Sequence, residues 1–404
     1  MKFWNLFLLF VLCGSIFGNS VFSFDGIPIQ NYGSDVYGKG MGESGISDLY
    51  RINTNYFNPS IAAMVNKVIF STAVSLGNFW YSDISGKGYR DDGLDFPYFS
   101  ITVPAANHKF AFNFNSFASG NLENELQNSW NDYEYSEVNR INSNIFKADL
   151  IYAHKNKFLN LGLALNYYFG HKTRFWELDF SDSEMTDTKY ESEQEFKNPG
   201  FAIGACKKIK NIAFGFSYSS YTKLDGNNYF KYIHSPFQDT LTTGNDYLYE
   251  IPERMSGGVT VKLTEKFKTS FDLYYDFYKK TEKYEQNTFK AAFGFAYEPL
   301  SGYGKWYEKI PLRLGGYYRE LPFLKNDEKV IEKAFTSGFS IPLKSPSKKI
   351  DVAVKYLVRG DTNLNRLRDK SIVFSIGITG FDIFSKRPKK IKDREIPEAD
   401  AEFE

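Results

Sequence analysis

The chain has 404 residues, with 49 Lys and Arg against 48 Asp and Glu, and its formal net charge is +1. This balance argues against a nucleic-acid partner, because a surface that binds phosphates needs an excess of basic residues. The mean hydropathy of −0.41 argues against a bundle of membrane helices. The 39 Phe, 29 Tyr and 31 Gly favour strands, tight turns and aromatic belts, which indicates β-structure at a lipid interface.

Residues 1–23 have the pattern of a secretory signal peptide. One lysine precedes an apolar run from Phe3 to about Phe17, and small and polar residues follow that run. The run has about 15 residues, fewer than the roughly 20 that a membrane-spanning helix needs, so we expect cleavage rather than anchoring. The expected cleavage site lies after Ser20 or after Ser23.

Apolar and polar residues alternate with a period of two through the rest of the chain. In FLNLGLALNYYFG at 158–170, leucines and aromatic residues alternate with Asn, Gly and Ala. No other stretch approaches 18 consecutive apolar residues, so transmembrane helices are excluded. About fourteen such runs lie near 67–76, 96–104, 109–119, 145–155, 158–173, 195–207, 211–224, 250–264, 267–280, 287–299, 310–321, 334–343, 349–360 and 371–384.

The connections between these runs alternate in length. Short ones, such as 105–108 and 208–210, lie between long polar ones at 77–95, 120–144, 174–194 and 225–249. Outer-membrane barrels show short periplasmic turns and longer external loops. A soluble β-sandwich also alternates, but nothing in it forces long and short loops to take turns. We therefore predict an all-β fold, a transmembrane antiparallel β-barrel of about fourteen strands over 67–384, because strands can span lipid only as a closed barrel.

Closure of the barrel assigns charged strand residues to the lumen, because an Arg or Lys at the lipid midplane costs about 2–4 kcal/mol. The lumen should hold Lys262, Lys290, Arg313, Lys355 and Asp351. Residues 24–66 are rich in Gly, Ser, Asp and Asn, and we expect them to lie inside the barrel as a hatch. Residues 385–404, a basic cluster followed by an acidic one, cannot bury a core and are expected to form a disordered periplasmic tail.

Four segments carry a resemblance to a known family. They are GKGMGESGISDLYRINTNYFNPSIAAM at 38–64, VPAANHKFAFNFNSFASG at 103–120, IPERMSGGVTVKLTEKFKTSFDLYYDFY at 251–278 and IPLRLGGYYRELPF at 310–323. These segments resemble the FadL-type (OMPP1) outer-membrane transporters of long-chain fatty acids and other hydrophobic compounds. The first resembles the Gly-rich hatch that leads to an Asn-Pro-Ala triplet in that family, although the third position here is Ser60.

The resemblance implies a fourteen-stranded barrel, filled by its N-terminus, that takes hydrophobic molecules from outside and releases them laterally or inward after the hatch shifts. Relatives in the wider superfamily serve aromatic hydrocarbons or secretion machinery, so fatty acids in particular do not follow.

The triplet Asn58, Pro59 and Ser60 is the candidate gate. Proline removes an amide donor and fixes φ, and Asn before it favours a turn, so the triplet is either a stop before the first strand or part of a movable gate. Phe24 would cap an apolar ligand pocket, as the N-terminal aromatic of the family does, if cleavage falls after Ser23.

The third predicted strand contains a change of phase. Phe110, Phe112 and Phe114 keep one parity and Phe117 takes the other, which a bulge or kink would produce. The family has a kink that opens a lateral exit in its third strand. We therefore predict a defect in the barrel wall near residues 115–117.

Basic residues of the lumen are candidates for a carboxylate head group, because Arg pairs with carboxylates bidentately. They are Lys262, Lys290, Arg313, Arg319 and Lys355. The alternative is that they pair with Asp272, Asp276 and Asp351 or with the hatch.

Catalytic chemistry has no support in the sequence. The Gly-rich stretch from Gly40 to Gly45 matches G-x-G-x-x-G, but the strand and helix that a dinucleotide site needs around it are missing, so we interpret it as a flexible hatch loop. The four histidines are scattered, without the ligand spacing of a zinc site. The one cysteine outside the signal segment, Cys206, is expected to face the lumen near a periplasmic turn. We expect no enzyme activity, no metal and no cofactor.

The predicted function is an outer-membrane channel, in a bacterium of the Gram-negative type, for uptake of small hydrophobic molecules such as long-chain fatty acids. Its partners would be those molecules and outer-membrane lipids, with no nucleic acid. The alternatives are a barrel of the same superfamily that anchors or shuttles secreted proteins, and a general porin. The sequence leaves the oligomeric state open, with a monomer as one option.

Overall fold

The structure is a computed structural model. It describes residues 20–23, 28–31, 34–52, 57–86, 88–130, 133–181, 187–234, 237–278, 286–299, 306–343 and 348–380. Phe24, most of the expected signal peptide and the C-terminal tail lie outside these ranges.

Strands dominate the described residues, and all of them join one antiparallel sheet of eighteen strands. Their bounds are β1 (Ile29–Gln30), β2 (Ile69–Asp83), β3 (Gly88–Asp95), β4 (Tyr98–Ala105), β5 (His108–Trp130), β6 (Tyr133–His154), β7 (Asn160–Phe180), β8 (Thr188–Ile209), β9 (Ile212–Ser219), β10 (Thr222–His234), β11 (Phe237–Ile251), β12 (Arg254–Lys262), β13 (Phe267–Asp276), β14 (Thr288–Tyr297), β15 (Leu312–Lys325), β16 (Glu328–Pro342), β17 (Lys349–Arg359) and β18 (Leu367–Thr379).

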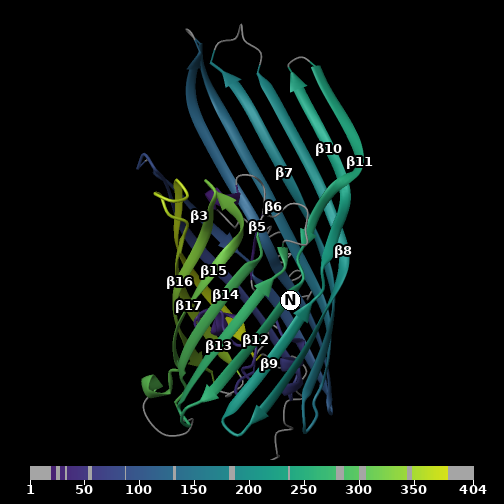
Figure 1. The fold of residues 1–404 in the computed structure, drawn as a ribbon, viewed down its shortest axis with the longest axis vertical. Coiled ribbons are helices and arrows are strands. Elements are labelled where there is room, and N and C mark those ends of the chain that lie inside the picture. Colours follow the sequence, from purple (N-terminus) through teal and green to yellow (C-terminus); the bar gives the residue numbers. More distant parts are fainter. Residues whose placement is uncertain are drawn as a thin grey trace, which may run out of the picture.

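The sheet closes on itself as a barrel (Figure 1). The last strand, β18, pairs with β2, so that Thr379 lies opposite Ser71 and Leu367 opposite Asp83. Three wall strands are each built from two pieces, namely β3 with β4, β9 with β10, and β11 with β12. With β1 added to the edge of β5, the described wall has fourteen strands, which confirms the predicted fold.

The helical elements are short and lie outside the wall strands. They are η1 (Val21–Ser23), α2 (Val36–Lys39), η2 (Pro59–Met64) and η4 (Trp306–Lys309). No helix in the described ranges has the length and apolar character needed to cross a membrane.

The predicted short turns join strands at one end of the barrel, but the prediction of long loops at the other end was wrong. Most of 77–95, 120–144, 174–194 and 225–249 is strand: β5 continues to Trp130, for example, and β7 to Phe180. Beyond the lipid both faces of a strand meet water, so neither face needs to be apolar. The strands can therefore stay paired there without the period-two alternation by which the sequence revealed them. Cross-strand pairs such as Glu123 with Arg140, 2.7 Å apart, support these parts.

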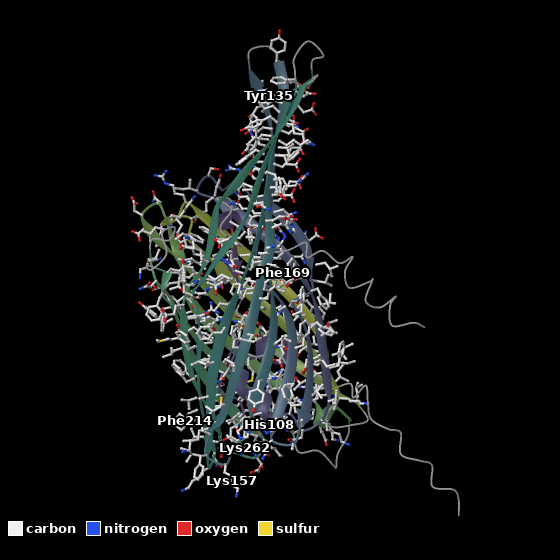
Figure 2. The ribbon with its side chains drawn as sticks, turned by 90° about the vertical axis from the view of Figure 1, so that its right-hand side faces the viewer. His108, Tyr135, Lys157, Phe169, Phe214 and Lys262 are labelled. Carbon is white, nitrogen blue, oxygen red and sulfur yellow. The ribbon has the colours of Figure 1, made fainter. Side chains whose placement is uncertain are left out.

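The outer face of β7 marks where the membrane belt ends. Leu161, Leu163 and Leu165 are exposed on that face, whereas Glu177 and Asp179 continue the same parity farther along the strand. Figure 2 shows Phe169 near mid-height and Tyr135 at the far tip. The strand ends above the belt therefore stand outside the lipid.

Neighbouring strands of the sheet continue upward together as this extension on one side of the barrel (Figure 1). We call it the tall sheet; it consists of the upper parts of β5, β6, β7, β8, β10 and β11. The other wall strands end lower. The rim of the barrel is therefore strongly asymmetric.

A charge placed on the belt should behave differently from one on the tall sheet. Leu163→Arg should destabilise the folded barrel by about 2–4 kcal/mol, because its side chain would enter lipid. Val138→Arg, at an apolar residue of the tall sheet that pairs with Glu177 and so lies on the same outer face, should leave stability nearly unchanged. Urea unfolding in lipid vesicles measures both, and equal losses would place the tall sheet in the membrane.

Candidate functional site

The N-terminal segment passes through the barrel and packs against the inside of the wall. Most of its described residues are buried, among them Val36, Met41 and Ile61. Helix α2 contacts β16, β17 and β18, whereas η2 contacts β5, β6, β7 and β8. The two short helices thus lie against opposite arcs of the wall.

The Gly-rich turn of the hatch is wedged against the wall. Gly42 has φ of +67°, and a Cβ there would lie 2.4 Å from the carbonyl oxygen of Phe293. Its amide donates to Thr336 Oγ1 at 2.8 Å, and the next turn is held by Asp272, whose Oδ2 accepts from Ile46 N at 2.9 Å. Only glycine fits this contact. The turn is a buried packing element, so its interpretation as a flexible loop was wrong.

Glu43 follows this turn and joins two wall strands. Its carboxylate is 2.6 Å from Lys290 Nζ on β14 and 3.1 Å from Lys355 Nζ on β17. Burial by itself raises the pKa of a carboxyl group, but the two ammonium groups outweigh burial and hold the pKa of Glu43 well below its usual range. The carboxylate is therefore ionised and links hatch to wall.

Tyr37 of α2 is surrounded by cations. The charged groups of Arg51, Arg313, Lys349 and Lys268 lie 4.2, 4.2, 4.4 and 4.9 Å from its ring centroid. Cations at such distances are attracted by the face of an aromatic ring. The Tyr37 hydroxyl also donates to Glu298.

Each of these cations also has a carboxylate partner. Arg51 pairs with Asp35 and Asp48, and Lys268 pairs with Asp48 at 2.9 Å. Arg313 and Lys349 both pair with Asp351, at 3.0 and 3.3 Å. Hatch and wall thus share one charge-balanced cluster around Tyr37.

The triplet Asn58, Pro59 and Ser60 lies against β7 and β8. Asn58 caps η2 by accepting from Ser60 N at 3.1 Å, and it donates to Ile46 O at 3.0 Å. It also donates to Cys206 Sγ at 3.0 Å, so Cys206 faces the lumen and holds the hatch. A Cβ at Gly162 would lie 2.3 Å from the Pro59 carbonyl carbon, so the triplet packs directly on β7.

The barrel wall is interrupted at Phe117. The ladder between β4 and β5 ends at Tyr98 opposite Asn115, and the ladder between β5 and β6 shifts register between Ser116 and Ala118. The wall defect predicted from the phase of the phenylalanines is confirmed. The bulge turns the Phe117 ring inward, where it packs edge-on against Tyr168 at 5.1 Å and is nearly buried.

Above this bulge the wall has an opening between β3 and β5. In the described ladders β3 pairs with β2 alone, and 120–130 of β5 pair with β6 alone. Leu94 on β3 is exposed on the lipid-facing side beside this gap. The N-terminal segment covers part of the gap, because β1 pairs with β5 through Ile29 opposite Ser119. We call this region the wall opening.

A small cavity of about 20 Å³ lies behind the wall opening. Phe117, Phe57 and Pro59 line it together with the charged groups of Lys147 and Arg254. A space of this size holds about one water molecule. Phe117 of the β5 bulge and Pro59 of the hatch triplet, which are far apart in the sequence, therefore line the same cavity.

The predicted basic residues do not gather into a single ligand site. Lys290 and Arg313 are fully buried and paired as described above. Lys262 lies at the periplasmic end with Lys157 (Figure 2) and pairs with Glu265 of the adjoining turn at 2.6 Å. This position on the rim contradicts a role for Lys262 in a lumen site. Phe24 lies outside the described residues, and Phe22 occupies an apolar cluster instead.

Two histidines that are distant in sequence are neighbours in the structure. His108 and His154 face each other across β5 and β6, with ring centroids 5.0 Å apart. Among the described residues, no group of three or more His, Cys, Asp or Glu is arranged to hold a metal ion.

Sequence reasoning missed Tyr37, Glu43 and Gln30 as organising residues of the hatch. Gln30 accepts from Arg254 Nη2 at 2.7 Å through its side chain and from Arg319 Nη1 at 2.9 Å through its carbonyl oxygen. Their partners come from strands more than 200 residues away, so no local spacing could mark them. The sequence did hold one signal of this role. Glu43 is an isolated acidic residue in a Gly-rich segment, and that segment was predicted to lie inside a barrel with lysines in its lumen.

Comparisons with known proteins agree with this architecture. A family model described as BamG matches residues 5–389. A FadL homologue of Pseudomonas aeruginosa has a TM-score of 0.62 at 13% identity, covering 88% of this chain and 99% of that one. The Pseudomonas putida toluene transporter TodX has a TM-score of 0.58 at 13% identity, covering 87% and 99%. The CymD monoaromatic hydrocarbon channel has a TM-score of 0.57 at 14% identity, covering 86% of this chain and 97% of that one.

No curated protein matches the chain. At such low identities the structural likeness concerns the fold. The fold is that of the FadL-type barrels of the outer membrane, as the four resembling segments implied.

Removing the carboxylate of Glu43 should loosen the hatch. Glu43→Gln removes the carboxylate that Lys290 and Lys355 share, and breaking a buried pair costs roughly 3–5 kcal/mol. The temperature at which the folded band on a semi-native gel disappears should fall. Glu265→Gln, which breaks an exposed pair with Lys262, should not shift it. Equal shifts of this temperature in the two variants would contradict a stabilising link between hatch and wall through Glu43.

The stabilisation of the folded protein by Glu43 should decrease as the pH falls. Its pKa is lowered in the folded protein, so its stabilisation is present above the ordinary carboxyl pKa of about 4.3 and is lost as the pH falls toward the folded pKa. The difference in stability between the parent and Glu43→Gln should be constant near neutral pH and should shrink below about pH 4.3. Denaturation curves recorded from pH 7 downward measure it. A difference that grows on acidification would contradict this assignment.

Proposed function

The chain belongs to the BamG family and has the fold of FadL-type outer-membrane barrels, and we propose that it is an outer-membrane channel that passes small hydrophobic molecules, such as long-chain fatty acids, through a gated opening in its wall. The observation that carries the proposal is the wall opening above Phe117. A closed ladder at this place would leave a hydrophobic molecule no lateral way between lumen and lipid.

The position of the opening suits an apolar cargo. The exposed Leu94 beside the gap faces outward, and the aromatic ring of Phe117 closes the gap from within. A molecule that leaves the lumen here enters lipid directly and avoids the periplasmic water. Apolar surface transferred from one apolar environment to another loses no favourable burial free energy on the way.

Under this proposal the arrangement described above is the closed state of the channel. The cavity behind the opening has room for about one water, so passage requires Phe117, the hatch around Pro59, or both to move. Strand β1 must also leave the β5 edge for the gap to widen. It is held there by two backbone pairings and by the bonds of Gln30 to Arg254 and Arg319.

A carboxylate head group would find its cation at this cavity rather than at the predicted lumen residues. Lys147 lies 3.2 Å from Asp149, and both line the cavity. An entering carboxylate can replace Asp149 as the partner of Lys147 without breaking a hatch contact. Lys290 and Arg313 would have to give up Glu43 and Asp351 first.

A general porin is a poorer fit to the described residues. A porin keeps a water-filled channel, whereas the hatch here is tied to at least five wall strands by charged and polar contacts.

Uptake of labelled long-chain fatty acid tests the proposal in a bacterium that lacks its own transporter. The parent should restore uptake, and Phe117→Ala should raise the initial rate several-fold because it removes the ring that closes the opening. Phe112→Ala is the matched control, since Phe112 lies on the lipid face of the same strand. Pro59→Leu should abolish uptake because the buried ring of Pro59 lies against Gly204, where a longer side chain would displace the triplet.

All variants must be compared at equal amounts of folded barrel in the outer membrane. No uptake by the folded parent would remove fatty acids as the substrate. Equal rates for Phe117→Ala and Phe112→Ala would contradict the wall opening as the path.

A second function, association with another protein at the cell surface, is favoured by the tall sheet. Its outer strands keep unpaired edges in the described ladders, at 120–130 of β5 and along β11. Such edges can add a strand from another chain. The face of the tall sheet that continues the lumen side carries Leu126, Trp176 and Tyr232, so a partner would also bury apolar surface.

A photo-crosslinker at Glu125, on the free edge, should give one discrete protein adduct in the native outer membrane if this second function holds. The same crosslinker at Lys157, in a periplasmic turn, should give a different pattern. Leu126→Lys should remove the adduct, because a charge on an edge strand opposes strand addition. A crosslinking pattern at Glu125 that Leu126→Lys leaves unchanged would contradict docking at the edge.

A further inference from the structure

Residues 20–23 form a bridge inside the extracellular end of the barrel. The turn η1 contacts both β5 and β18. Ser20 and Ser23 are both buried, and Ser23 N donates to Ser20 O at 2.9 Å. Both candidate cleavage sites of the signal peptide, after Ser20 and after Ser23, fall in this segment, so its contacts discriminate between them.

Phe22 anchors the bridge. Its ring is 4% exposed, stacks on Phe323 with centroids 6.4 Å apart, and packs with Leu321 and Val330. Gly360, at φ of +70°, makes room for it, because a Cβ there would lie 2.3 Å from the ring. Cleavage after Ser23 would remove this ring and leave an apolar void. Cleavage after Ser20 keeps it.

The carboxylate of Asp369 lies at the start of the bridge. It is 2% exposed on β18, and its Oδ2 accepts from the Ser20 hydroxyl. The backbone amide of Val21 lies close enough to Asp369 to favour its ionised form. Among the described residues, its Oδ1 is buried and accepts no hydrogen bond.

Asp369 shares the cation nearest to it, Arg359, with Glu332. Arg359 Nη1 is 3.2 Å from Asp369, but two nitrogens of the same guanidinium lie 2.6 and 2.8 Å from Glu332. Arg319 is also directed to Glu332, at 3.9 Å. A buried carboxylate that shares its counter-ion is costly, and a second positive group beside it would offset that cost.

We propose that signal peptidase cleaves after Ser20 and that the new α-ammonium group of Val21 pairs with the buried carboxylate of Asp369. Hydrolysis of the Ser20–Val21 bond consumes one water, leaves a carboxylate on Ser20, and frees an amine on Val21 that takes up a proton. The small residues Gly18 and Ser20 suit the positions that the peptidase reads before the cut, whereas a cut after Ser23 would place Val21 at the first of them.

The pairing would lock the processed N-terminus in place. The ammonium takes over the carboxylate that the Ser20 hydroxyl contacts in the uncleaved chain. It thereby ties η1, and through it the hatch, to the strand that closes the barrel. The inference is independent of what the channel transports, because it concerns only the maturation of the chain.

The first experiment determines the N-terminus of the protein purified from the outer membrane, by Edman sequencing or by mass spectrometry of the N-terminal peptide. The expected sequence begins at Val21. A start at Phe24, or at any residue before Val21, would overturn the cleavage site.

The second experiment tests the ion pair between the α-ammonium of Val21 and Asp369. It measures the rate at which an amine-reactive reagent acylates the Val21 amine at fixed pH. In the folded parent the rate should be at least about tenfold lower than in the denatured protein, because an ion pair that raises the amine pKa by one unit leaves a tenth of the amine free. Asp369→Asn should restore much of the rate while Phe22 keeps the segment buried. Asp327→Asn, at an exposed turn, is the control and should not change it.

If Asp369→Asn does not fold, the pH dependence of labelling in the parent replaces it. A midpoint above about pH 9 would support the ion pair, whereas a midpoint near the ordinary value of about 8 would overturn it. An unchanged labelling rate in folded Asp369→Asn would also overturn it.

Discussion

The carboxylate of Glu43 lies between lysines of two wall strands, and much of the remaining architecture depends on pairing of this kind. A barrel in lipid must turn its charged side chains inward, so the lumen collects Lys290, Lys355 and Arg313. Buried charges are tolerated only when they are paired. The hatch supplies carboxylates, Tyr37 and backbone amides at the matching heights, so the charges of wall and hatch neutralise each other.

These contacts are unevenly distributed, and the distribution suggests where the molecule can open. The cluster around Tyr37 and the Gly-rich turn tie the hatch to β13 through β17 with charged and backbone contacts. The opposite arc, near Phe117, has a register shift, a two-residue strand that covers a gap, and a small cavity. Motion at that arc disturbs few ion pairs. A lateral path through the wall therefore requires less rearrangement than displacement of the whole hatch.

The same arc carries the tall sheet, so the weakest part of the wall lies beneath the largest structure outside the lipid. Strands β5 and β6 run without interruption from the periplasmic turns to the tip, apart from the bulge at Phe117. The proposed transport path and the proposed docking edge therefore both involve β5.

The sequence by itself determined the barrel. Its period-two alternation, its short turns and the phase of the phenylalanines are local properties of the chain, and they led to the fourteen strands and to the bulge at Phe117. Only the tertiary structure decided the length of the strands beyond the membrane, because strands that meet water on both faces leave no periodic signal, and the partners of Glu43, Tyr37 and Gln30. Those partners lie hundreds of residues away, and barrel closure alone brings them to the same height in the lumen.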